Sequence, residues 1–136
     1  MTDKPITSGI YKYRKAILLL FAFTTLGTLA GTLLPASSYD LPDAIWRQDK
    51  IGHFIMFLIW TTLFGAFLAV KSHTKPKLLA VFLYSAAFGL VIEALQLTLP
   101  TNRSAELYDF IADIAGSLAA IGVLRLIFKR TYPTSE

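Results

Sequence analysis

The chain has 136 residues, of which 54% are hydrophobic and only 16% are charged, and its mean hydropathy is +0.55. Soluble domains carry about 25% charged residues, so this composition predicts one integral membrane domain over residues 1–136. Because the sequence contains no cysteine, it excludes disulfides, thiolate metal sites and cysteine nucleophiles.

Four apolar stretches are long enough to cross a bilayer as helices. About 20 helical residues at 1.5 Å each span the hydrocarbon layer. A signal peptide is the alternative for the first stretch, but its apolar run exceeds the usual length of about 7–15 residues, and no clean cleavage site follows. We therefore expect an all-α, integral membrane four-helix bundle with transmembrane helices over residues 16–34, 51–70, 78–99 and 107–128.

The Lys and Arg residues outside these stretches predict the orientation of the bundle. Most lie near the N-terminus, in the connection 71–77 or near the C-terminus, whereas Arg47, Lys50 and Arg103 lie in the other two connections. Short connections follow the positive-inside rule, so we expect both termini in the cytoplasm and residues 35–50 and 100–106 outside. This topology also explains the net charge of +4, which makes nucleic acid an unexpected partner.

Ionisable and amide side chains gather near the outer ends of the last three stretches. They are Asp49, Lys50 and His53 at the second stretch, Glu93 and Gln96 in the third, Arg103 in the following connection, and Asp109 and Asp113 in the fourth. Spacings of three or four residues place the members of each helix on one face. Charged groups that face lipid are costly, so we expect the three faces to enclose one extracytoplasmic polar pocket.

These residue types suit binding and proton transfer. Lys50 and Arg103 are expected to hold a phosphate or carboxylate, because Arg makes bidentate hydrogen bonds to such groups. His53 and Glu93 are the candidates for a catalytic acid or base, since an imidazole or a buried carboxyl group can exchange protons near neutral pH. The other candidate substrate-binding residues are Asp49, Gln96, Asp109 and Asp113.

Three further interpretations remain open. Acidic residues and histidine within a membrane can relay protons. Oxygens with one imidazole can hold a divalent metal, but no spacing here matches a named metal motif, so we assign no metal ligand and name no cofactor. Structural contacts could also account for the residues, through an ion pair of Arg103 with Asp109 or Glu106 and a helix-start contact between Asp49 and His53.

Three segments carry a resemblance to a known family. The sequences DKIGHF (49–54), GLVIEALQ (89–96) and DFIADIAG (109–116), with Arg103 after a Pro turn, resemble the pattern of the VanZ-like family of small membrane proteins. The chain departs from that pattern at Asp113, where the family has Asn. The resemblance implies a four-helix architecture, a bacterial inner-membrane location and the positions of the site residues.

The family is named for a protein associated with resistance to teicoplanin, a glycopeptide that binds cell-wall precursors. The resemblance and the polar pocket together predict a protein that binds or modifies an anionic envelope molecule, either a phospholipid or a lipid-linked cell-wall precursor, with an effect on glycopeptide susceptibility. The alternative is a non-catalytic membrane subunit or helix-bundle interaction protein whose polar layer is structural, and which contacts a protein partner or forms a homo-oligomer. The sequence does not decide whether the protein is an enzyme.

Overall fold

The structure is a computed structural model that describes residues 8–34, 49–100 and 106–132. Its helices are α1 (Ser8–Tyr11), α2 (Arg14–Leu33), α4 (Asp49–Ser72), α5 (Leu78–Thr98) and α6 (Leu107–Thr131). The described ranges contain no strand, and the four long helices are each apolar enough to cross a membrane. The predicted all-α membrane architecture is therefore confirmed.

α2, α4 and α6 extend beyond the predicted apolar stretches at one or both ends, whereas α5 is one residue shorter than predicted. α4 begins at Asp49, so this acidic residue lies in the first turn, where the helix dipole favours a negative charge. α4 ends at Ser72, and His73 adopts the left-handed conformation (φ 57°) that reverses the chain. α5 ends at Thr98, two residues before Pro100. The early start of α4 matters because it brings Asp49 and Lys50 into helical register with His53.

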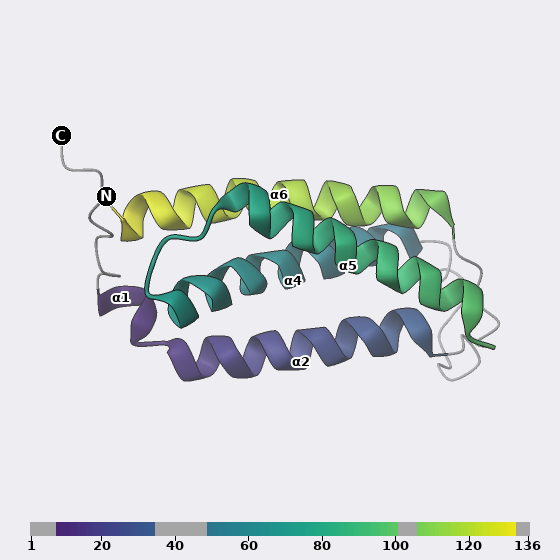
Figure 1. The fold of residues 1–136 in the computed structure, drawn as a ribbon, viewed down its shortest axis with the longest axis horizontal. Coiled ribbons are helices and arrows are strands. Elements are labelled where there is room, and N and C mark those ends of the chain that lie inside the picture. The colour runs from purple at the N-terminus through teal and green to yellow at the C-terminus, as the bar shows by residue number, and fades with distance from the viewer. Residues whose placement is uncertain (1–7, 35–48, 101–105, 133–136) are drawn as a thin grey trace.

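Consecutive long helices run in opposite directions, so α4 and α6 are parallel to each other (Figure 1). These two helices make the most extensive contact in the bundle. They approach closely at Gly116, where a Cβ atom would collide with the carbonyl oxygen of Phe54. α5 packs against α6 and α4, and α2 lies on the outside against α4. The core is thus a three-helix unit of α4, α5 and α6.

The distribution of side chains is that of a membrane protein. Large hydrophobic side chains cover the surface, and Phe23 and Leu97 are 74% and 75% exposed. Among the described residues, the buried polar side chains are Thr28, Thr32, His53, Thr61, Ser85, Glu93, Gln96, Asp109, Asp113 and Ser117. An apolar exterior around a partly polar interior fits a lipid solvent, where polar groups must find partners inside the bundle.

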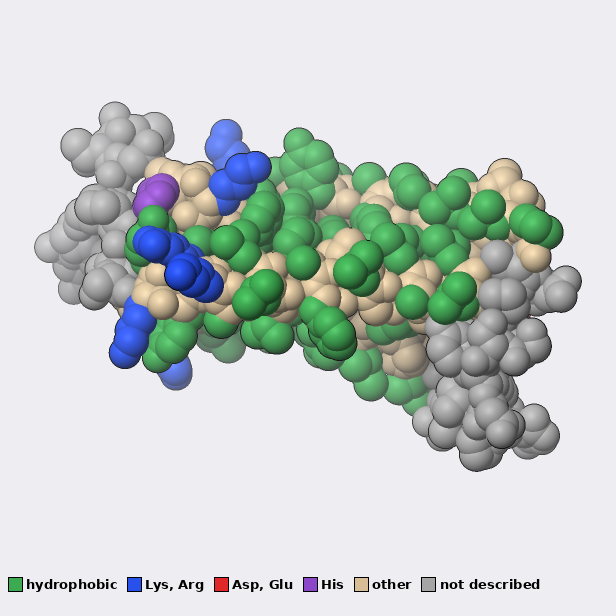
Figure 2. All heavy atoms as spheres, turned by 90° about the horizontal axis from the view of Figure 1, so that it is seen from below, with side chains coloured by type: hydrophobic (Ala, Val, Ile, Leu, Met, Phe, Trp, Pro, Cys, Tyr) green, Lys and Arg blue, Asp and Glu red, His purple; other side chains and the backbone are tan. Residues whose placement is uncertain are grey.

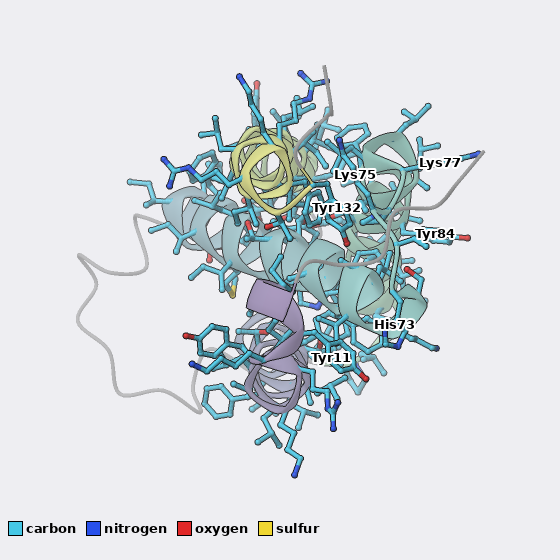
Figure 3. All side chains as sticks on the ribbon, turned by 90° about the vertical axis from the view of Figure 1, so that its left-hand side faces the viewer. Tyr11, His73, Lys75, Lys77, Tyr84 and Tyr132 are labelled. Carbon is cyan, nitrogen blue, oxygen red and sulfur yellow. The ribbon has the colours of Figure 1, made fainter. Side chains whose placement is uncertain are left out.

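The described Lys and Arg side chains other than Lys50 lie toward one end of the bundle, which we call the basic end (Figure 2). This end is formed by α1, the connection 73–77 and the end of α6, and Figure 3 looks onto it. Here the Tyr11 ring lies 4.7 Å from the His73 ring, and the Arg14 guanidinium lies 4.7 Å from the Tyr11 ring. Burial raises the pKa of the Tyr132 hydroxyl just after α6.

Candidate functional site

The candidate site lies at the end of the bundle opposite the basic end, where α4 and α6 begin and α5 ends (Figure 1). Each of these helices directs one face toward the other two. The buried residues on these faces recur at intervals of four, as with His53, Phe57 and Thr61 on α4 or Ser85, Gly89 and Glu93 on α5. Because side chains four apart share a helix face, the sequence spacing predicts these stripes correctly.

His53 of α4 and Asp113 of α6 form a buried pair of ionisable side chains. The His53 Nδ1 atom lies 2.9 Å from Asp113 Oδ1, and the two side chains are 1% and 0% exposed. The carboxylate fixes the orientation of the imidazole ring and accepts a hydrogen bond from Nδ1–H when that nitrogen carries the proton. A buried His–carboxylate pair of this kind can hold and transfer a proton or orient a ring nitrogen toward a ligand.

Glu93 of α5 completes a group that we call the carboxylate layer (His53, Glu93 and Asp113). Glu93 is 9% exposed, and ligand atoms of the three side chains lie within 4.8 Å of one another. Neither Glu93 Oε1 nor Asp113 Oδ2 has a hydrogen-bond partner among the described residues. Buried carboxylate oxygens without partners are expensive, so this layer is electrostatically incomplete in the described part of the chain.

A rim of charged side chains lies next to the carboxylate layer. Lys50 Nζ is 3.0 Å from Glu106 Oε2 and 3.3 Å from Asp109 Oδ1, so one cation serves two acidic groups. Asp109 is buried, and its carboxylate lies within 4.8 Å of ligand atoms of His53 and Asp49. The structure therefore brings together the predicted residues Asp49, Lys50, His53 and Asp109.

Two other predicted site residues are placed differently. Gln96 lies on the same helix as Glu93, but its Nε2 atom donates a hydrogen bond to the Thr32 carbonyl oxygen at 2.9 Å. Gln96 therefore ties α5 to α2, and its Oε1 atom has no partner among the described residues. Arg103 lies outside the described residues.

Gly89 leaves room beside the carboxylate layer. A Cβ atom at this position would lie 3.2 Å from Asp113 Oδ2 and 3.4 Å from ring atoms of Phe110 and Phe57. These contacts are tight, so a larger residue would press on the Asp113 carboxylate. The glycine thus lets the unpartnered oxygen of Asp113 lie against the backbone of α5.

A second polar group lies deeper in the bundle and was not assigned from the sequence. Thr61, Ser85 and Ser117, which we call the hydroxyl layer, are each 0% exposed. Ser85 Oγ lies 2.8 Å from Ser117 Oγ, and Thr61 Oγ1 lies 3.2 Å from Ser117 Oγ and also bonds Ser85. Thr61 follows His53 by eight residues and Ser85 precedes Glu93 by eight. A spacing of eight residues is about two helical turns and indicates the same helix face, so it could have been used to identify Thr61 and Ser85 from the sequence.

The described side chains give the site a clear chemical character. Five carboxylates, Asp49, Glu93, Glu106, Asp109 and Asp113, meet one ammonium group and one imidazole. Lys50 is already paired with Glu106 and Asp109, and His53 with Asp113. The arrangement can therefore transfer protons or attract a cation. Among the described side chains of the site, Lys50 is the only one that could pair with an anion.

One comparison with known proteins identifies a relationship. A family model described as VanZ/LLP1 matches residues 6–128. No curated protein and no solved structure matches the chain. The match covers α1 to α6 through Phe128, including every residue of the carboxylate layer and its rim.

Proposed function

The chain belongs to the VanZ/LLP1 family, and from this premise we propose that its carboxylate layer and rim form a site for the charged headgroup of an envelope lipid. The ligand is a phospholipid or a lipid-linked cell-wall precursor. His53 and Glu93 supply the proton-transferring groups, and the rim holds the headgroup. By binding such a precursor, the protein would affect glycopeptide susceptibility.

The observation that carries this proposal is the pair of buried, unpartnered oxygens Glu93 Oε1 and Asp113 Oδ2. Ionisable groups inside a membrane protein are costly and mark functional sites. A purely structural polar layer would be expected to satisfy its own members. The hydroxyl layer does so a few turns away in the same bundle.

The position of the site also supports a lipid headgroup as ligand. The carboxylate layer lies close to the start of α4 and α6, about one turn from the rim residue Lys50. A group at this depth lies near the boundary between hydrocarbon and headgroups, where a lipid phosphate resides. Lys50 is half exposed, and Arg103 follows α5 in the sequence, so both are proposed to contact the anionic part of the ligand.

The bundle is proposed to lie in a bacterial inner membrane with both termini in the cytoplasm. The gathering of Lys and Arg at the basic end supports this orientation. A reporter that is active only outside the cytoplasm, fused after Thr74, should then remain silent, whereas the same reporter inserted after Asn102 should be active. The opposite pattern would place the site on the cytoplasmic side.

Site function is tested by replacing Glu93 with Gln, which keeps the side-chain volume and removes the carboxylate. We expect normal abundance in the membrane, together with loss of any change that the wild-type protein causes in lipid composition or teicoplanin susceptibility on overexpression. His73→Gln at the basic end, far from the site, serves as the control. The proposal would be contradicted if overexpression of the Glu93→Gln variant changed the lipid profile and the susceptibility as much as overexpression of the wild type does.

The hydrogen bond from Gln96 to Thr32 favours a second candidate, a helix-bundle interaction protein in which polar groups only join helices. This candidate and the first predict different results for Glu93→Gln. If the polar groups are structural, Glu93→Gln should reduce membrane abundance. If they form a site, abundance should persist while the envelope phenotype is lost.

A further inference from the structure

The carboxylate layer has the composition and the geometry of a divalent-metal site. His53, Glu93 and Asp113 come from α4, α5 and α6, and each offers one ligand atom within 4.8 Å of the other two. Ligands about 2.1 Å from one cation are separated by no more than about 4.2 Å. Inward shifts of at most about 0.7 Å for each atom would bring the three atoms around a single ion.

Two buried oxygens point independently to a ligand in this layer. Glu93 Oε1 and Asp113 Oδ2 have no hydrogen-bond partner among the described residues, although Asp113 is 0% and Glu93 is 9% exposed. Two carboxylates and a neutral imidazole carry a formal charge of −2, which one divalent cation balances. A cation would thus satisfy both the charge and the unpartnered oxygens of the layer.

Without an ion, the His53–Asp113 contact holds two of the proposed ligands next to each other. A proton between their two atoms joins them, and a bound cation would displace that proton. Here Asp113 Oδ1 lies 2.9 Å from His53 Nδ1, and both side chains are buried. The imidazole is therefore held in place before any ligand arrives.

A second group, Asp49, His53 and Asp109, meets the same distance limit but is less suitable. Asp109 Oδ1 lies 3.3 Å from Lys50 Nζ, so a cation would have to compete with an ammonium group already present. Asp49 is only partly buried and already has an interaction of its own. We propose that His53, Glu93 and Asp113 bind one divalent transition-metal ion, and that the rim lies between this ion and the end of the bundle.

The donor set indicates which ions fit. Imidazole suits Zn²⁺ and other first-row transition metals, whereas carboxylates also accept Mn²⁺ and Mg²⁺. One imidazole with two carboxylates therefore favours Zn²⁺ or Mn²⁺ over Mg²⁺, which prefers oxygen ligands and retains its waters. This inference does not depend on the envelope ligand proposed above, because it concerns only the binding of the ion.

The test uses the full-length chain in detergent, purified through a tag without histidine and stripped with EDTA. Calorimetric titration with ZnCl₂ and MnCl₂ should show one saturable ion per chain, and MgCl₂ should bind more weakly. His53→Gln and Glu93→Gln should each weaken Zn²⁺ binding by about 100-fold, and Asp113→Asn by about 10-fold. The matched controls, His73→Gln at the basic end and Glu106→Gln at the rim, should remain within about twofold of the wild type.

Direct ligation has its own signature. Mn²⁺ bound to the wild type should show ¹⁴N coupling in electron spin-echo spectra. The His53→Gln variant, which keeps Asp113, should lack this coupling while its circular dichroism remains helical. A helical wild-type chain without saturable Zn²⁺ or Mn²⁺ binding would overturn the proposal even if every variant misfolds. Equal affinity in the wild type and in the Glu93→Gln and Asp113→Asn variants would also overturn it.

Discussion

Two buried polar layers lie in the same three-helix core, and they differ in how their hydrogen bonds are satisfied. The hydroxyl layer, formed by Thr61, Ser85 and Ser117, is closed, because each hydroxyl group contacts the other two. The carboxylate layer is open, because Glu93 Oε1 and Asp113 Oδ2 lack partners among the described residues. Both layers take one residue from each of α4, α5 and α6, so their helical setting is the same.

This difference separates structure from function. Interhelical hydroxyl bonds in membranes contribute about 0.6 kcal/mol each, and a closed set needs nothing from outside the bundle. A buried carboxylate without a partner destabilises the fold unless a ligand, an ion or a proton compensates it. We therefore expect that neutralising Glu93 in the carboxylate layer raises the stability of the protein, whereas removing a hydroxyl group from the hydroxyl layer lowers it.

The largest effect is expected for His53→Ala. This change removes the partner of Asp113 Oδ1 and leaves a fully buried carboxylate with neither oxygen paired to a described side chain. Breaking a buried pair from one side costs about 3–5 kcal/mol. The free energy of unfolding, measured in mixed detergent and SDS micelles, should fall by this amount. A loss below about 1 kcal/mol would show that Asp113 does not depend on His53.

Neutralising Glu93 should change the free energy of unfolding in the opposite direction. In a chelator, Glu93→Gln should raise the free energy of unfolding by about 1–3 kcal/mol, since a neutral amide replaces a buried carboxylate whose Oε1 atom has no partner among the described residues. Enzyme and binding sites are commonly less stable than their neutralised variants. The same unfolding assay measures this change. A clear decrease in stability would mean that Glu93 is a structural member of the bundle.

The contact between α4 and α6 provides a test outside both layers. Gly116→Ala would place a Cβ atom against the backbone of Phe54 and Leu58, which cannot move like a flexible side chain. Overpacking of this kind costs about 1–3 kcal/mol. Thermal unfolding should show the loss. Gly122→Ala on the same helix, where no atom lies within 4 Å of the added Cβ, is the control and should be neutral or slightly stabilising.

The smallest effect is expected in the hydroxyl layer. Ser117→Ala removes the bonds to Thr61 and Ser85, which still bond each other, so the loss should be about 1.2 kcal/mol with an unchanged envelope phenotype. A loss of the phenotype in this variant, with stability retained, would extend the functional site to the hydroxyl layer and remove the contrast between the two layers.

The fold could be predicted closely from the sequence because lipid imposes a simple rule. Apolar stretches of about 20 residues must form helices, and the four long helices were all predicted within three residues of their ends. The helix faces that the polar residues share also followed from helical spacing. Asp49 is an example, since α4 begins early enough to place it beside His53 and Asp109.

The partners of individual side chains could not be predicted in the same way. Helical spacing says which residues share a face, but it does not specify the rotation of one helix against another. Gln96 was grouped with Glu93, yet its amide donates to Thr32 on α2. The sequence placed His53, Glu93 and Asp113 in one pocket but did not single them out as a group, because they lie on three helices and have no short-range sequence motif.

The central claim, that the carboxylate layer is kept for function at the expense of stability, is tested most directly by one paired measurement on Glu93→Gln. The free energy of unfolding in a chelator and the envelope phenotype on overexpression are measured for this variant and for the wild type. We predict equal or higher stability together with a lost phenotype. Lower stability, or a phenotype that persists in the folded variant, would contradict the claim.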